Sequence, residues 1–263
     1  MNRIEDIGYG STLPLELIEL TEGKRSETGE VDFLYKLVGA IKGKRLIDLC
    51  AGTGRLSIEL IKRQARVFAL EGSYGMIELI KKRCNDLPYD VASNLNLVIG
   101  DVCEIDYPKD IDAIIITDGS IGYFFHGKDL SKVLYSSFLS LNNGGILVLH
   151  LFNSKIRMKK DLVNKVRIRS EYHDERTKNH IIQYRHSVLD DKKGIVETIY
   201  ENMFFYDEHL RWKQDSMMRY KLFSVDEVIQ VAADVGLTLS QVYGSYSMEP
   251  VSKNSDYILV FFK

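Results

Sequence analysis

The chain has 263 residues, of which 45% are apolar and 27% charged, a balance that excludes a disordered or collagen-like protein. Its 35 Lys and Arg residues nearly match its 37 Asp and Glu residues, and a net charge of -2 excludes a global electrostatic attraction to nucleic acid. No run approaches the ~18 apolar residues that a membrane-spanning helix needs. The three cysteines lack CxxC spacing and the N-terminus does not resemble a signal peptide, so we expect a cytoplasmic protein.

The first part of the chain has mixed character, and a regular alternation follows it. Residues 1–43 are expected to form an N-terminal helical lid, because apolar residues recur at helical spacing in "VDFLYKLVGAIKG". From Lys44 onward, apolar strands alternate with helices of about 10–15 residues, which predicts a parallel sheet with helices on both faces. The expected elements are strands in 44–50, 66–71, 95–101, 111–117 and 144–152, with helices in 54–64, 75–87 and 128–141.

After Asn153 the pattern changes to consecutive antiparallel strands, expected in 166–173, 180–190, 195–207 and 210–223. One helix then returns at Ser224, a candidate N-cap with Glu227 three residues later, and two strands in 237–244 and 256–263 close the chain. We therefore divide the chain into a lid, 1–43, a core, 44–154 with 220–263, and an antiparallel β insertion, 155–219, which is a candidate substrate or dimer subdomain.

The strongest local signal is "LIDLCAGTGRLSIEL", residues 46–60. A strand ends at Asp48, and a glycine-rich turn then opens a helix, whose free N–H groups and exposed backbone suit a bound ligand. The next two strands also end in acids, Glu71 and Asp101. Ligands of open α/β sheets bind at the carboxyl ends of the strands. The sequence therefore predicts a ligand with a ribose diol for Glu71 and an exocyclic purine amine for Asp101.

These acids favour a cationic nucleoside over a dinucleotide. The dinucleotide fingerprint has Gly or Ala at its sixth position, where "GTGRLS" has Ser57. Asp48 would sit badly against a pyrophosphate but well beside an ammonium group. S-adenosylmethionine carries a ribose, an adenine and an ammonium–carboxylate tail without phosphate, so it suits the acids better than NAD does.

The sequence resembles the class I S-adenosylmethionine-dependent methyltransferases. "LIDLCAGTGRL" matches their glycine-rich motif, "ALEGSYGMI" their ribose motif and "GDVCEID" their adenine motif. The resemblance covers about residues 31–153 and 220–263. It implies an α/β fold, a Rossmann-like seven-stranded mixed sheet whose last strand is antiparallel, with an antiparallel β insertion before the last helix. The layout of the insertion is similar to the branch that N-methylates small amines, amino sugars and peptide α-amino groups, often in natural product biosynthesis.

The resemblance implies a set of cofactor-binding residues. It places Asp48, Ala51, Gly52 and Gly54 around the methionine tail, Glu71 and Gly72 at the ribose, Ser73 and Met76 near the adenine, Asp101 and Val102 at the adenine edge, Thr117 and Gly119 near the sulfonium, and Tyr9 of the lid at the carboxylate.

Candidate residues for the methyl acceptor follow the fourth and fifth core strands or lie in the insertion. Asp118, His150 and Tyr123 are candidate catalytic residues, and Phe124, Phe125, Arg185, Trp212 and Arg219 are candidate substrate contacts. Structural interpretations stay open for all of them: Asp118 as a turn residue, His150 as a structural histidine, the aromatic residues as core, and the insertion residues as solvent-facing.

Methyl transfer from a sulfonium is an in-line displacement, in which the protein mainly aligns the acceptor and excludes water. A neutral amine needs no strong base, whereas a hydroxyl or carboxyl acceptor does. The six histidines lack metal-ligand spacing, so no metal is expected. "TDGSIGYF" differs from the Asn/Asp-Pro-Pro-aromatic run of DNA adenine methyltransferases, which makes a nucleic-acid substrate unfavoured.

We therefore expect methyl transfer from S-adenosylmethionine to an amine of a small molecule, amino sugar or peptide N-terminus. The sheet of the insertion is a candidate homodimer contact, with a role at the substrate pocket or a solvent-facing role as the alternatives. Two alternatives stay open: an O-methyltransferase acting on a small-molecule hydroxyl or carboxyl, and a non-catalytic nucleotide-binding module.

Overall fold

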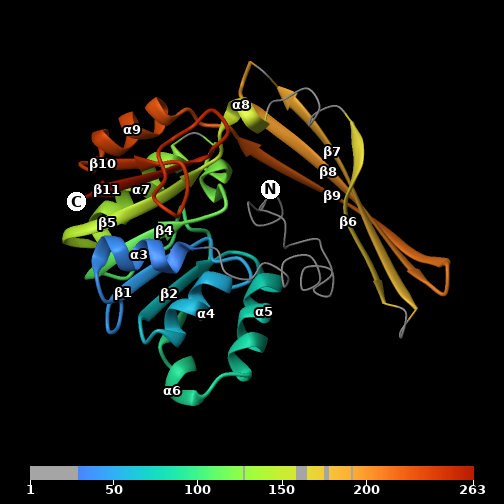
Figure 1. Cartoon of the computed structure of the whole chain (residues 1–263), viewed down its shortest axis with the longest axis horizontal. Helices are drawn as coiled ribbons and strands as arrows, with labels where there is room; N and C mark the ends of the chain where they lie inside the picture. Colours follow the sequence, from blue (N-terminus) through green and yellow to red (C-terminus); the bar gives the residue numbers. More distant parts are fainter. Residues whose placement is uncertain (1–28, 127, 158–164, 175–177, 191) are drawn as a thin grey trace.

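The computed structural model describes residues 29–126, 128–157, 165–174, 178–190 and 192–263, whose strands form two separate sheets (Figure 1). Sheet A has seven strands in the order β10-β11-β5-β4-β1-β2-β3. Sheet B has four antiparallel strands in the order β6-β7-β8-β9 and stands beside sheet A (Figure 1). The predicted fold class is confirmed. Most of the predicted lid, and Tyr9 with it, lies outside the described residues.

The strands of sheet A are β1 (Arg45–Leu49), β2 (Arg66–Glu71), β3 (Leu95–Ile99), β4 (Ile111–Ile116), β5 (Leu141–Leu151), β10 (Thr238–Tyr243) and β11 (Tyr257–Phe262). β11 runs antiparallel to its neighbours β5 and β10, and the other pairings in the sheet are parallel. The carboxyl ends of β1 to β5 and of β10 therefore lie at one edge, and the hairpin between β10 and β11 crosses that edge.

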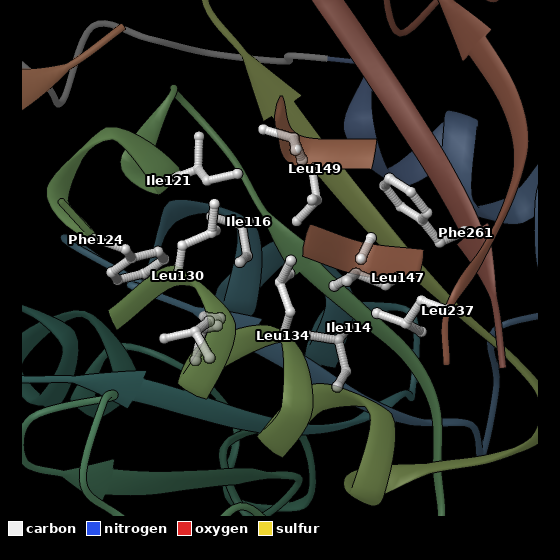
Figure 2. Close-up of a cluster of buried hydrophobic side chains, with 14 of the residues drawn as sticks. Ile114, Ile116, Ile121, Phe124, Leu130, Leu134, Leu147, Leu149, Leu237 and Phe261 are labelled. Carbon is white, nitrogen blue, oxygen red and sulfur yellow. The ribbon is translucent and has the colours of Figure 1, made fainter. Parts of the chain in front are cut away.

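Helices cover both faces of sheet A. The helices are α3 (Glu30–Val38), α4 (Arg55–Lys62), α5 (Tyr74–Asn85), α6 (Tyr89–Ala92), α7 (Asp129–Ser140), α8 (Ser154–Arg157) and α9 (Val225–Asp234), with a 3-10 helix, η1 (Ser120–Tyr123). Apolar residues of α3 and α4 pack on one face, and those of α7 and α9 on the other. Figure 2 shows the second of these layers, where Leu130 and Leu134 of α7 pack with Ile114 and Leu147. Two-sided burial explains the continuous apolar runs of β4 and β5.

Sheet B consists of β6 (Val166–Asp174), β7 (Asn179–Asp190), β8 (Ile195–Tyr206) and β9 (His209–Lys221). Its inner face carries Ile181, Gln183, Arg185, Ser187 and Leu189 of β7 with their cross-strand partners. This face packs on the rest of the molecule near both ends: Ile181 contacts α5, and Leu189 lies in a cluster that includes Tyr123 and Phe152. The opposite, outer face exposes several apolar side chains.

The last helix begins as the sequence predicts. Ser224 is its N-cap, and the Ser224 hydroxyl accepts a hydrogen bond from the Glu227 N–H at 3.1 Å. The Glu227 carboxylate bonds to the Lys221 ammonium group. Glu227 thus links the start of α9 to the end of β9, which fixes where the insertion returns to the core.

Candidate functional site

The carboxyl ends of β1, β2 and β3 bring the three predicted acids to the same edge of sheet A. β1 pairs with β2, and β2 pairs with β3, with Glu71 opposite Ile99. Asp48 lies near the end of β1, Glu71 ends β2, and Asp101 follows β3 by two residues. The grouping inferred from sequence spacing is therefore present in the fold.

Asp48 is 1% exposed and ties the end of β1 to the first turn of α4. Its Oδ2 atom accepts hydrogen bonds from the Ser57 N–H at 3.1 Å and from the Ser57 hydroxyl at 2.7 Å. Burial raises the pKa of Asp48 to about 6, although the Ser57 hydroxyl and the nearby Arg55 charge oppose that rise. A buried, partly compensated carboxylate of this kind gains from a cationic ligand.

Glu71 holds the glycine-rich turn open for a ligand. Its Oε2 atom accepts a hydrogen bond from the Gly52 N–H and its Oε1 atom one from the Ser73 N–H, both at 2.8 Å. Burial raises the pKa of Glu71, while these backbone donors favour its charged form. The Gly72 backbone also favours the charged carboxylate, and because a carboxylate has about four acceptor positions, Glu71 retains capacity for a ribose hydroxyl. Gly52 has φ +57, and no atom lies within 4 Å of the position a Cβ would take there. The donor set and the open backbone fit S-adenosylmethionine.

The other predicted cofactor residues surround these acids. The Asp101 Oδ1 atom accepts a hydrogen bond from the Cys103 N–H at 2.8 Å, and Val102 is buried in the core. Ser73 is the N-cap of α5, and Met76 packs towards sheet B. Ala51 and Gly54 form the turn after β1, where the Gly54 N–H donates to the Ala51 carbonyl, and Gly72 lies next to Gly100.

The loop after β4 contains Thr117, Asp118 and Gly119. Thr117 is 8% exposed, whereas the Asp118 side chain is 51% exposed and lies 3.6 Å from the Arg55 Nη2 atom. Gly119 has φ +69, and a Cβ there would lie 2.3 Å from the Phe152 ring. A glycine is therefore required for Phe152, which follows β5, to pack against this loop.

Beside this loop, Arg55 forms an ion pair with a buried carboxylate. The sequence analysis missed this pair. The Arg55 Nη1 and Nη2 atoms each donate to a Glu30 carboxylate oxygen at 2.9 Å, and the Glu30 side chain is 2% exposed. A bidentate Arg–carboxylate pair is geometrically specific. This pair attaches the start of α3 to the start of α4, next to Asp118.

His150, near the end of β5, lies against a carboxylate from the β10–β11 hairpin. Its Nε2 atom is 3.4 Å from the Asp256 Oδ2 atom, and its buried Nδ1 atom has no hydrogen-bond partner in the described part of the chain. The Asp256 Oδ1 atom accepts a hydrogen bond from the Asn153 N–H at 2.7 Å. Burial raises the pKa of Asp256, but bonds from His150 and Asn153 and the Arg157 charge outweigh burial and lower it.

The candidate substrate residues separate into different environments. Tyr123 donates its hydroxyl to the Met218 sulfur at 2.7 Å, Phe124 is buried in the core, and Phe125 packs against His126. Arg185 lies on the inner face of sheet B, where its Nε atom donates to the Ser187 hydroxyl at 2.9 Å. Arg219 lies on the outer face and pairs with Glu197 at 2.6 Å. The Trp212 side chain is outside the described part of the chain.

Sequence reasoning missed Arg55, Asp256 and Tyr246. Arg55 directly follows the glycine-rich turn, and this position in the sequence was the signal that could have marked it as a site residue. Asp256 and Tyr246 lie in the β10–β11 hairpin, which no motif marks. Their proximity to the site depends on how that hairpin crosses the sheet edge.

Residues 46–145 match the family described as "Methyltransferase domain". The fold is similar to an S-adenosylmethionine-dependent methyltransferase from Clostridium acetobutylicum, at 17% identity and a TM-score of 0.75 over 94% of this chain and 96% of that chain. It is similar to the sugar N-methyltransferase KedS8 from Streptoalloteichus sp, at 15% identity and a TM-score of 0.75 over 98% of this chain and 95% of that chain. It is also similar to CalS10, an amino pentose methyltransferase from Micromonospora echinaspora in complex with S-adenosylmethionine. The identity is 16% and the TM-score 0.70, over 97% of this chain and 100% of that chain. No curated protein sequence matches the chain. Among the described residues, none of the helices has the length and apolar character needed to cross a membrane.

Proposed function

This chain is an S-adenosylmethionine-dependent methyltransferase, and we propose that it methylates an amine of a small molecule, an amino sugar or a peptide N-terminus. The methyltransferase-domain match, together with the fold, confirms the predicted family, enzyme class and cofactor. The amine is our inference. Two of the structural neighbours, an amino pentose methyltransferase and a sugar N-methyltransferase, support it by analogy of fold.

The observation that carries this proposal is the exposed Asp118 carboxylate at the end of β4. The Asp118 side chain is 51% exposed, whereas Asp48 at the same edge is buried, and the charge of Asp118 attracts an amine that arrives as an ammonium ion. S-adenosylmethionine, when bound, supplies a methyl group on a positively charged sulfur. Asp118 would orient the amine, and the Phe152 ring packed on Gly119 would exclude water beside it.

The cofactor assignment is tested by calorimetric titration of S-adenosylhomocysteine into the wild-type protein and a Glu71→Ala variant. We expect the variant to bind about 10–100-fold more weakly, since it loses hydrogen bonds from a charged acceptor worth roughly 1.5–3 kcal/mol. Glu78→Ala is the matched control, because the Glu78 carboxylate is exposed on α5 and pairs with Lys81. Unchanged affinity in Glu71→Ala would contradict the ribose role.

A second candidate function is O-methylation of a hydroxyl or carboxyl, which the contact between His150 and Asp256 favours. A histidine oriented by a carboxylate has the arrangement of a general base. The two functions are separated by a His150→Ala variant that still binds S-adenosylhomocysteine. Loss of methyl transfer in that variant favours a hydroxyl or carboxyl acceptor, and retention together with N-methylated product in mass spectrometry favours the amine.

We also propose that the insertion forms a homodimer through the outer face of sheet B. A cross-strand row of exposed apolar residues runs across this face, including Val166, Ile199 and Met217 at 68%, 44% and 54% exposure. Ion pairs lie on both sides of the row: Glu197–Arg219 and Glu201–Lys213. Residues of both signs flank the apolar row, so a twofold axis can bring the positive residues of one copy opposite the negative residues of the other. A second copy of this chain therefore fits the face. Sedimentation should give a dimer for the wild type and a monomer for Ile199→Asp; a wild-type monomer contradicts the proposal.

A further inference from the structure

Tyr246 has a buried hydroxyl without a hydrogen-bond partner among the described residues. It lies in the hairpin between β10 and β11, and its ring packs edge-on against Phe33, with centroids 5.6 Å apart, and against His150, also at 5.6 Å. The Oη atom is buried and has no hydrogen-bond partner within the part of the chain that the structure describes. A buried hydroxyl without a partner destabilises a fold, so such a group beside two aromatic rings points to a ligand.

The surroundings of Tyr246 place its side chain near the cofactor edge. The Tyr246 Cβ atom is 3.6 Å from the position a Cβ on Gly29 would take, directly before Glu30 at the start of α3. Glu30 holds Arg55, which in turn lies 3.6 Å from Asp118. The Tyr246 ring therefore stands beside a charged cluster at the ends of β1 and β4.

The charges of this cluster keep the phenol protonated. Burial raises the pKa of Tyr246, and the negative charges of Glu30 and Asp118 raise it further, against the opposing effect of Arg55. A neutral phenol can donate its proton in a hydrogen bond to an anionic oxygen. The Tyr246 hydroxyl is therefore a hydrogen-bond donor for an anionic group of a ligand. The nearby carboxylates favour a ligand that carries a positive charge as well.

We propose that Tyr246 donates a hydrogen bond from Oη to the α-carboxylate of the methionine tail of S-adenosylmethionine. The tail carries both a positive and a negative group: its ammonium group suits the buried Asp48 carboxylate, and its carboxylate requires a hydrogen-bond donor. Tyr246 supplies that donor from an element far along the chain from the glycine-rich turn. This inference rests on the proposed function, because it concerns the same bound nucleoside.

The test compares two ligands and three forms of the full-length protein by calorimetry. S-adenosylhomocysteine has the amino-acid tail, whereas 5′-methylthioadenosine has the same nucleoside without it. In Tyr246→Phe, which keeps the ring packing, we expect S-adenosylhomocysteine to bind about tenfold more weakly and 5′-methylthioadenosine to bind as in the wild type. Tyr243→Phe is the control, since Tyr243 packs on the same Phe33 ring at 5.5 Å and we expect it to bind both ligands as the wild type does.

The outcomes separate this inference from the proposed function. A wild-type protein that binds neither ligand contradicts the methyltransferase assignment itself. If the wild type binds S-adenosylhomocysteine and Tyr246→Phe binds it equally well, the inference is overturned, and a raised KM for the acceptor in that variant would move the hydroxyl to the acceptor side. Equal weakening for both ligands also overturns it, because the effect would then be structural.

Discussion

The two sheets of the molecule are buried in different ways, and each way suits a different role. Sheet A is covered by helices on both faces, so strands such as β4 are almost wholly apolar and buried. Sheet B packs through its inner face, while its outer face carries exposed apolar and charged side chains. Burial of both faces of sheet A fixes the position of the edge that carries Asp48 and Glu71. Burial of only one face of sheet B leaves its outer face available for contact with another molecule.

The buried surfaces also differ in chemistry. The core of sheet A is apolar, as Figure 2 shows for the layer under α7. The inner face of sheet B has a polar middle: the Gln183 amide donates to Asn202 at 2.7 Å, and the Ser187 and Thr198 hydroxyls are 2.9 Å apart. These four side chains are at most 1% exposed. Sheet A thus depends mainly on apolar burial, and sheet B depends in part on satisfied hydrogen bonds.

The largest effect is expected from a cavity in sheet A. Ile115→Ala should lower the free energy of unfolding by about 2–5 kcal/mol, because Ile115 is 1% exposed in β4, the middle strand of sheet A. Val188→Ala on the outer face of sheet B, where the side chain is 42% exposed, should change it by less than about 0.5 kcal/mol. Urea unfolding measures the free energy of unfolding of both variants. Similar losses in the two variants would contradict the proposed difference in burial between sheet A and the outer face of sheet B.

A smaller, pH-dependent effect is expected from Asp48→Asn. Burial raises the pKa of Asp48 from its ordinary 3.8 to about 6, so ionisation costs stability as pH rises through that interval, and the cost is fully present above it. Asparagine can accept the same bonds from Ser57 without a charge. The variant should gain up to about 3 kcal/mol at pH 8, with the gain shrinking as pH falls towards 4, and should bind S-adenosylhomocysteine more weakly.

Thermal unfolding of Asp48→Asn at several pH values checks this prediction. Asp32→Asn is a suitable control, because Asp32 is exposed on α3 and makes a surface ion pair with Arg63. A pH-independent gain in Asp48→Asn would show that the buried charge is not the source of the instability at the edge of sheet A.

The smallest effect is expected for the ion pairs of sheet B. Arg219→Ala removes an exposed pair with Glu197 and should lower the free energy of unfolding by about 0.2–1 kcal/mol, less at high salt. Chemical unfolding of a monomeric background such as Ile199→Asp, at low and high salt, isolates the pair from dimer formation. A salt-independent loss above that range would mean that the Arg219 side chain stabilises the single copy by more than its exposed ion pair with Glu197.

Local patterns predicted the parts of the molecule that local chemistry determines. The strands of sheet A, the grouping of Asp48, Glu71 and Asp101 and the Ser224 N-cap all follow from hydrophobic runs and from residues at strand or helix ends. Parallel topology then places the acids at one edge without further information.

Features that depend on long-range register were beyond the sequence. Arg185 and Arg219 lie on opposite faces of sheet B because each face is set by the pairing of the strands, including an irregularity between Phe204 and Phe205. A shift of one residue reverses the face of every side chain in a strand. Tyr246 and Asp256 reach the site through a hairpin whose position depends on pairing between β5 and β11.

The contact between Gly119 and Phe152 has a consequence for how the enzyme can diversify. A single added carbon at position 119 would occupy the place of the aromatic ring, so the residue there and the residue at 152 cannot change size independently. Because Gly119 also has φ +69, a side chain there would strain the backbone even if the residue at 152 were smaller. This contact therefore holds the loop after β4 against the segment that follows β5, and variation in the methyl acceptor is expected to arise from exchanges at other positions.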